Sequence, residues 1–321
     1  MTKRDGDFQP LGDVLIDAAK KFKPPSRVQR RLFDNATDIG MHDPDNVKFL
    51  HSLFCQTMLP YRASDARTWE HRNGDAILSV EAGRALDPQT QSYIDLPLPC
   101  GAGARLVQIH MDSEAIKNQS PEIEVSDSMT SFAKNMLGFD PNGYQIRQLK
   151  TQLGALSAAT IRIAKTGKNP FQVQTHIVKK FDLWFPKDAN QRVLWPSTII
   201  MAPDYYQSLI NHAVPLDPRA VAGLSHNAMA LSIYSWLAQR LCCIYPRKPS
   251  FVAWNNLWQQ FGPNYKRIRK FREIFNVAFK QVQTQYPRAE ITVSRGGLKL
   301  YHSAPPIERK IVSLNSGKPL E

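Results

Sequence analysis

The sequence lacks the features that would place the protein in a membrane or outside the cell. It contains no run of about 18 apolar residues, the length that a transmembrane helix needs. Its first residues, MTKRDGDFQPLGD, are polar and of mixed charge, unlike a secretory signal peptide. We therefore expect the protein to act in the cytoplasm.

Motifs for metal binding and catalysis are also scarce. The four cysteines have neither a CxxC motif nor the spacing of metal ligands, and they are Cys55, Cys100, Cys242 and Cys243. We expect reduced, partly buried thiols. The pattern GxxxxGK(S/T) does not occur, so nucleotide hydrolysis has no evident site. His110, Asp112 and Glu114 alternate by two, a spacing that scatters side chains around a helix rather than gathering metal ligands. The sequence predicts a binding protein without catalysis, cofactor or metal.

Acidic residues are few in the last quarter of the chain. From Pro246 onward there are 14 lysines and arginines against four acidic residues, a local net charge of +10 out of +13 overall. Charge gathered in this way indicates a polyanionic partner, either nucleic acid or an anionic membrane. The ordinary alternative is a solvated basic surface with no partner.

The middle of the chain has the order of elements of a winged helix. A strand at 122–125 precedes a helix that ends at Gly138, and the turn FDPNG leads into a second helix. That helix has an apolar stripe, which is Ile146, Leu149, Leu153 and Leu156. The segments ATIRIAKTG and FQVQTHIV then alternate with period two, which predicts a β-hairpin. Upstream, Asn73-Gly74 predicts another hairpin.

The same order recurs after a linker, FPKDANQRVLWPS at 185–197. One helix is expected near Pro203, a second is expected to be capped by Ser225, and a third by Ser250. Gly262 and Pro263 end the third helix, and Asn264 is expected to cap the next, at about 265–284. The final alternating segment, AEITVSRGGLKLYH, predicts a hairpin with a basic tip.

We therefore predict an α+β fold, mostly α, built from tandem winged-helix domains. The prediction begins with an N-terminal segment at 1–58 that is partly helical or flexible, followed by a first winged helix at 59–186. A linker at 187–197 leads to a second winged helix at 198–310, which makes the main DNA contact, and a flexible tail follows at 311–321.

The fourth helix of the second domain begins with an unusual density of positive charge. Cations at a helix N-terminus oppose the helix macrodipole and cost roughly 0.3–1 kcal/mol each. A bound phosphate removes this cost, because it neutralises the side chains and meets the free backbone N–H groups. The predicted DNA contacts here are Lys266, Arg267, Arg269, Lys270 and Arg272, with Arg295 and Lys299 on the wing. A solvated polar face is again the alternative.

The first domain offers a sparser set of candidates. On its second helix, polar side chains lie opposite the apolar stripe, and lysines follow in the predicted wing. The candidates are Tyr144, Arg147, Gln148, Lys165 and Lys168.

Several motifs together resemble one known family. They are LPYR at 59–62, WxxRNG at 69–74, LPLPCGAGARLVQIHMDSEAIKNQSPEIEVSDSMTSF at 96–132 and YQIRQLKTQLGALSAATI at 144–161. This run resembles the plasmid-encoded RepA family of replication initiators, over roughly residues 55–310 and most strongly over 96–162. Where the family has LPYG, this chain has LPCG, so Cys100 stands at a tyrosine position.

The resemblance implies a protein of plasmid-bearing bacteria that binds double-stranded DNA at direct repeats, called iterons, in the plasmid origin. It also implies two winged-helix domains, origin opening by monomers and self-association into dimers that repress their own gene and so control plasmid copy number. The implied partners are the host initiator ATPase and the replicative helicase.

Two alternatives stay open on the sequence. A transcriptional repressor with the same tandem winged-helix body would use the same DNA-binding chemistry. A nicking rolling-circle initiator would use Tyr205 or Tyr206 as nucleophile, but such an enzyme needs a histidine pair, and no His-x-His occurs in the sequence.

Overall fold

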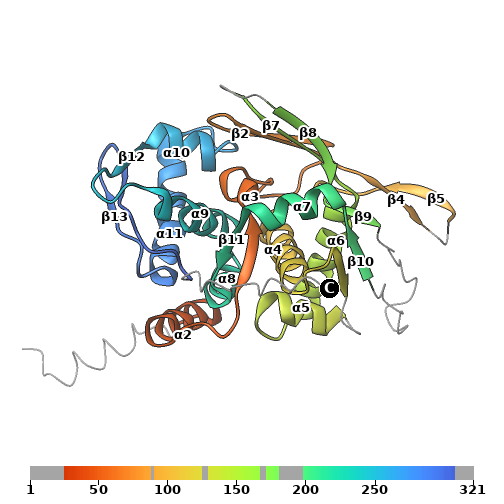
Figure 1. Ribbon diagram of the computed structural model, residues 1–321, viewed down its shortest axis with the longest axis horizontal. Coiled ribbons are helices and arrows are strands. Elements are labelled where there is room, and N and C mark those ends of the chain that lie inside the picture. The colour runs from red at the N-terminus through yellow and green to blue at the C-terminus, as the bar shows by residue number, and fades with distance from the viewer. Residues whose placement is uncertain (1–24, 88–89, 125–128, 167–170, 181–197, 308–321) are drawn as a thin grey trace, which may run out of the picture.

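The computed structural model describes residues 25–87, 90–124, 129–166, 171–180 and 198–307 (Figure 1). Helices and short antiparallel sheets follow one another along the chain, so the fold is α+β, as the sequence predicts. The predicted linker, 187–197, and the predicted tail, 311–321, lie outside the described residues.

The helices differ widely in length, and α4, α6 and α11 are the longest. They are α2 (Arg27–Met41), α3 (Ser52–Gln56), α4 (Gly101–Lys117), α5 (Met129–Leu137), α6 (Gly143–Ala158), α7 (Pro203–His212), α8 (Pro218–Leu224), α9 (Ala228–Arg240), α10 (Trp254–Phe261) and α11 (Ile268–Gln285), with a short 3-10 helix at Leu241–Cys243.

The strands are short and belong to several small sheets. They are β1 (Lys48–His51), β2 (Thr68–Asn73), β3 (Ala76–Glu81), β4 (Arg84–Asp87), β5 (Ser92–Asp95), β6 (Glu122–Glu124), β7 (Thr160–Lys165), β8 (Phe171–His176), β9 (Val178–Lys180), β10 (Thr198–Met201), β11 (Ala213–Leu216), β12 (Ser250–Ala253), β13 (Ile291–Val293) and β14 (Gly297–Leu300).

The predicted hairpin at Asn73-Gly74 is confirmed. Strands β2 and β3 pair in register from Thr68 opposite Glu81 to Asn73 opposite Ala76. Gly74 has a φ of +56°, in the left-handed region that a tight turn needs and that glycine adopts at no steric cost. The sheet continues through β7 and β8, in the order β2-β3-β7-β8.

Helices α5 and α6 and the hairpin β7–β8 follow in the predicted order. Gly138 ends α5 with a φ of +75°, and its N–H donates to the carbonyl of Lys134. Asn142 caps α6: its Oδ1 accepts from the Gln145 N–H, and Gln145 Oε1 accepts from the Asn142 N–H, both at 2.9 Å. Leu149, Leu153 and Leu156 are buried, so the predicted apolar stripe faces the core.

The C-terminal part repeats this order with α10, α11 and the hairpin β13–β14, and β12 extends the hairpin to a three-stranded sheet. Gly262 ends α10, as predicted, because its N–H donates to the carbonyl of Trp258. The apolar face of α11 is a row of buried rings, Phe271, Phe275 and Phe279, with neighbouring centroids 5.4 and 5.9 Å apart.

Three of the predicted helix caps are wrong. Ser225 is the C-cap of α8, and Asn227 caps α9 by accepting from the N–H groups of Met229 and Ala230. Ser250 lies in β12 instead, opposite Leu300. Helix α11 begins at Ile268, later than predicted, and Arg267 rather than Asn264 is its N-cap residue. Each misplaced cap stood a few residues before the true start. Ser250 is held there in a strand by a distant partner, whereas Ser225 and Asn264 lie in local turns, where Ser225 donates to the carbonyl of Ala222 and the Tyr265 N–H donates to the carbonyl of Gly262.

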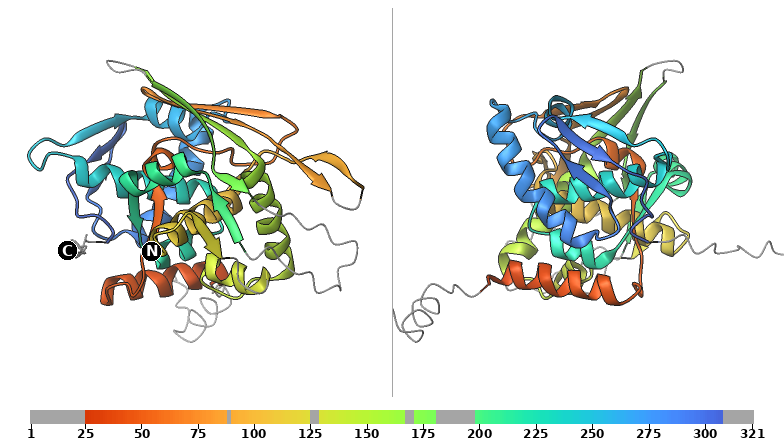
Figure 2. Two further views of the ribbon diagram at one scale, coloured as in Figure 1. Left: turned by 45° about the vertical axis from the view of Figure 1, so that its right-hand side comes forward. Right: turned by 90° about the vertical axis from the view of Figure 1, so that its left-hand side faces the viewer.

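Segments that are far apart in the sequence join the two halves. Strand β1 pairs with β11, with Leu50 opposite Val214, and β10 pairs with both β6 and β9. Helix α2 packs against α8 and α11 (Figure 2). Gln285 Nε2 donates to the carbonyl of Leu32, and Asn35 Nδ2 donates to the carbonyl of Arg219, both at 2.7 Å. The buried apolar side chains form one continuous cluster across both halves.

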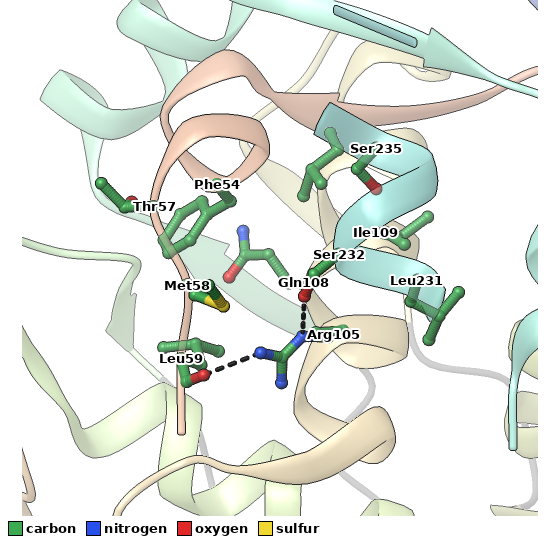
Figure 3. A pocket seen from close by; sticks show the side chains of 11 residues that line it. Phe54, Thr57, Met58, Leu59, Arg105, Gln108, Ile109, Leu231, Ser232 and Ser235 are labelled. Atoms are coloured by element: carbon green, nitrogen blue, oxygen red, sulfur yellow. Dashed lines mark hydrogen bonds between the residues drawn. The ribbon is translucent and has the colours of Figure 1, made fainter. Parts of the chain in front are cut away.

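A buried arginine lies at this junction, on α4. Arg105 Nε donates to the Ser232 hydroxyl on α9 at 2.8 Å, and Nη2 donates to the carbonyl of Leu59 at 2.7 Å (Figure 3). Nη1 donates to the carbonyls of Pro60 and Gly101. Burial lowers the pKa of Arg105 to about 10, so the side chain is still charged at neutral pH. The guanidinium therefore stabilises the junction through carbonyl and hydroxyl acceptors.

Candidate nucleic-acid interface

The candidate interface is the outward face of α11 together with the hairpin β13–β14. One face of α11 packs on α9 and α10, through the buried phenylalanines described above. An amphipathic helix held in this way turns its polar residues to solvent. In Figures 1 and 2 this helix lies at the edge of the molecule, away from α5 and α6.

The four cations at the start of α11 are all exposed. Lys266 and Arg267 precede the first helical residue, and Arg269 and Lys270 lie in the first turn. The Arg269 side chain is 92% exposed. No side chain caps this helix, and its first turn holds no acidic residue. Positive side chains and backbone N–H groups therefore point to the same end of α11, an arrangement that suits an anionic ligand.

Glu273 is the acidic residue that these cations contact. Lys270 Nζ lies 3.1 Å from Glu273 Oε2, and Arg269 Nε lies 3.7 Å from Oε1. Both pairs are well exposed, and exposed pairs of this kind contribute about 0–1 kcal/mol. Two cations share one carboxylate, so both can exchange it for a phosphate at little cost.

Arg272 lies over an aromatic ring instead of in solvent. Its guanidinium carbon is 4.6 Å from the centroid of the Trp254 ring, a cation–π contact that orients the half-buried side chain. The Trp254 backbone N–H donates to the carbonyl of Gly296 at 3.0 Å, and its indole N–H donates to the carbonyl of Ser294 at 3.3 Å. Trp254 therefore joins α11 to the turn of the hairpin.

The hairpin carries the two remaining cations of this set. Arg295 is exposed in the turn between β13 and β14, which the Ser294 N–H closes by donating to the carbonyl of Gly297. Lys299 is exposed on β14, with its Nζ 5.4 Å from the centroid of the Tyr301 ring. Because Trp254 donates to carbonyls on both sides of Arg295, the turn lies next to the ring that Arg272 covers.

The predicted residues of the first half lie elsewhere. Tyr144, Arg147 and Gln148 are exposed on α6, whose other face packs on α4 and α5. The side chain of Lys165 and all of Lys168 lie outside the described residues. Since α4 and α9 stand between α6 and α11, the structure does not gather the two predicted sets into one cluster.

The outward face of α11 continues beyond the cations predicted from the sequence. Val277 is 60% exposed, and Lys280 is exposed one turn further on. Counting steps of three and four residues from Arg269 would have found Glu273, Val277 and Lys280 on one face. Glu273 and Val277 were missed because the prediction followed positive charge, and Lys280 was missed because the prediction considered only the start of the helix.

Tyr205, one of the two tyrosines considered as a nucleophile, is enclosed. Its side chain is buried, and its hydroxyl donates to Asp112 at 2.9 Å and accepts from Gln108 Nε2 at 2.7 Å. Tyr206 is half-buried on the same helix, α7. Among the residues that the structure describes, no group of three or more His, Cys, Asp or Glu side chains is placed to hold a metal ion. Within that same part of the chain, no helix is long and apolar enough to span a bilayer.

The α+β fold carries an exposed cationic helix at its edge, and part of the chain also matches a known protein family. Residues 98–260 match the family described as plasmid encoded RepA protein, which is half of the chain. The chain therefore belongs to the plasmid-encoded RepA family of replication initiators, and the resemblance seen in the sequence is confirmed. The matched region ends at Gln260, so α11 and its hairpin lie beyond it.

The chain is also distantly similar to solved structures. A crystal structure of RctB domains 2-3 is 9% identical, with a TM-score of 0.46, and the match covers 74% of this chain and 83% of that chain. A selenomethionine derivative of domains 2 and 3 of RctB is 7% identical, with a TM-score of 0.48, and the match covers 77% of this chain and 93% of that chain. No curated protein matches the chain.

Proposed function

We propose that this RepA-family protein initiates plasmid replication by binding iteron repeats of the origin as double-stranded DNA. In this proposal α5, α6 and β7–β8 form a first winged helix, and α10, α11 and β13–β14 form a second. Helix α11 enters the major groove, and the hairpin lies on the neighbouring backbone as a wing. The protein recruits the host initiator ATPase and replicative helicase in the cytoplasm, self-associates to repress its own gene, and performs no catalysis itself.

The observation that carries the proposal is the start of α11. Lys266, Arg267, Arg269 and Lys270 are exposed together at a helix N-terminus, where each of them opposes the macrodipole. The adjacent carboxylate of Glu273 pairs with two of them only at the surface. Phosphate groups of a duplex would offset this repulsion and accept from the free N–H groups. The net charge of +13 supports the same partner.

The experiment is a binding titration of the purified protein on its own origin DNA at several salt concentrations. We predict that Arg269→Ala combined with Lys270→Ala weakens binding and flattens the slope of log K against log salt by about 0.9 for each phosphate that is no longer neutralised. The matched control is Arg27→Ala combined with Arg30→Ala, which removes two exposed cations from α2. We expect the control to keep the wild-type slope, and both variants to unfold at the wild-type temperature.

Unchanged affinity and salt slope in the α11 variant would show that this helix is not the DNA contact. Replication of an origin plasmid in cells that lack the gene separates an initiator from a repressor, because a repressor alone would not restore it. We expect the wild-type protein to restore replication and the α11 variant to fail.

A further inference from the structure

The outward face of α11 carries more than positive charge. Arg269, Glu273 and Val277 follow one another at intervals of four residues, and Lys280 comes three residues after Val277. Such spacings place side chains on one face of a helix. All four are exposed, opposite the buried phenylalanines. Along the helix, this face therefore presents a cation, a carboxylate, an apolar side chain and a second cation.

This row is long enough to cross a major groove. Lys280 lies eleven positions after Arg269, which at a rise of 1.5 Å per residue is about 17 Å. The major groove of B-DNA is about 12 Å wide, and long cationic side chains add reach at both ends. With the two cations on opposite phosphate backbones, Glu273 and Val277 lie between them, at the depth of the base edges.

Stabilising the helix is a poor explanation for Glu273. The carboxylate follows its cations in the chain, the less favourable orientation for pairs three or four residues apart. The macrodipole favours an acidic side chain only within the first turn of a helix, and Glu273 lies beyond that turn. A side chain that is 52% exposed and negative would repel the phosphates of an approaching duplex. A base amino group compensates for this repulsion, because a carboxylate accepts a hydrogen bond from cytosine N4.

Val277 is similarly unsuited to an exposed helical position without a partner. A β-branched side chain has a lower helix propensity than the straight-chain polar residues usual at such sites. It leaves apolar surface in water, one turn from the carboxylate. The major groove offers one apolar group for such a side chain, the 5-methyl of thymine.

We propose that Glu273 and Val277 select the base sequence of the repeat, Glu273 by accepting from the amino group of a cytosine and Val277 by packing on the methyl of a thymine. The inference rests on the proposed DNA-binding function and adds the residues that make it specific. Arg269, Lys270 and Lys280 supply affinity for the backbone, and the pair between them supplies discrimination.

The experiment uses the full-length protein and a panel of repeats in which each base pair is changed in turn. Glu273→Gln is expected to lose about tenfold discrimination at one C·G position, the value of one good base contact, while its affinity for unrelated DNA rises because a negative charge is gone. Glu290→Gln, the same charge change at an exposed site outside α11, is expected to keep the wild-type discrimination profile.

Val277 is tested by replacing each thymine with deoxyuridine, which removes the methyl group alone. The wild-type protein is expected to lose about fourfold in affinity at one position, as burial of one methyl group gives. Val277→Ala is expected to be insensitive to that replacement.

If Glu273→Gln bound every repeat in the panel more tightly by the same factor, Glu273 would contact only its cation partners and no base. If wild type and Val277→Ala were equally sensitive to deoxyuridine, Val277 would not contact a thymine methyl group. Either result overturns the inference at that residue. A wild-type protein without preference for its origin over unrelated DNA would instead overturn the proposed function itself.

Discussion

Several ionisable side chains are buried in the first half of the molecule without an opposite charge. His110 on α4 packs against the edge of Phe132, with ring centroids 4.8 Å apart. Burial lowers the pKa of His110 to about 3, and the charges of Lys48 and Lys117 act in the same direction. Asp112, two residues away, behaves oppositely: burial raises its pKa to about 7, although His51, Tyr205 and Gln108 all donate to it. These groups make folding depend on pH.

The sign of the His110 contribution follows from its lowered pKa. Below pH 6.5 the unfolded chain binds a proton that the folded chain refuses until about pH 3, so stability falls as the pH falls through this window. Each pH unit well inside the window corresponds to about 1.4 kcal/mol. Asp112 contributes in the opposite direction, because its raised pKa favours the folded state below about pH 4 and the benefit is lost as the pH rises towards 7.

We predict that, compared with wild type, His110→Gln gains about 2 kcal/mol of stability at pH 5 relative to pH 6.5, because the unfavourable contribution of the histidine is removed while the opposite contribution of Asp112 remains. Denaturant unfolding at pH 5, 6 and 7 measures this. His176→Gln changes an exposed histidine and is the matched control. Identical pH dependence in wild type and His110→Gln would contradict the assignment.

At the scale of elements, the C-terminal hairpin depends on a close approach of two strands. Gly297 lies opposite Ala253 in the pairing of β14 with β12. A Cβ at position 297 would overlap the carbonyl of Val252 and lie 2.9 Å from Ala253 Cα, both of which are backbone atoms. The adjacent Gly296 has more room, since its Cβ would meet only the end of the Phe251 ring at 3.3 Å.

We predict that Gly297→Ala lowers the free energy of unfolding by about 1–3 kcal/mol, because backbone must move to admit the methyl group. Gly296→Ala is the matched control and is expected to change it by about 0.5 kcal/mol or less. Thermal and denaturant unfolding of the two variants provide the comparison. Equal stability of both variants would show that β12 and β14 adjust freely.

For the whole molecule, the important feature is that the halves share one core. The pairing of β1 with β11 and the packing of α2 on α8 and α11 connect the beginning of the chain to its C-terminal part. Arg105 adds a buried junction between α4 and α9, next to a cavity of about 20 Å³ that has room for about one water molecule. We therefore expect the described part of the chain to unfold as one cooperative unit.

We predict that Arg105→Met destabilises the protein by about 3 kcal/mol, because the Ser232 hydroxyl and the carbonyls of Leu59 and Gly101 lose the guanidinium as donor, and the Pro60 carbonyl keeps the Gly101 N–H alone. Urea unfolding followed by circular dichroism and by tryptophan fluorescence measures both stability and cooperativity. Arg62→Met, at an exposed position, is the control. If the two probes gave separate transitions, and Arg105→Met moved only one of them, the halves would be independent domains.

Local patterns were enough to predict most of the elements. The stripe on α6, the Asn73-Gly74 turn and the alternation around Arg295 are short-range signals, because each depends on helical or strand periodicity and on turn chemistry. The caps at Ser225, Ser250 and Asn264 were wrong because a capping residue is recognised only relative to its helix start. For Ser250 a distant contact decided that start, because the residue pairs with Leu300 in a sheet.

The sequence by itself determined the α+β class, the RepA family and the placing of positive charge at the start of α11, because composition, motifs and periodicity are properties of the local chain. Tertiary structure alone decided that Trp254 orients Arg272 beside the hairpin turn, that β1 completes a sheet with β11, and that Tyr205 is enclosed by Asp112. Each of these is a contact between residues distant in sequence, and such contacts depend on how the whole chain packs rather than on any local pattern.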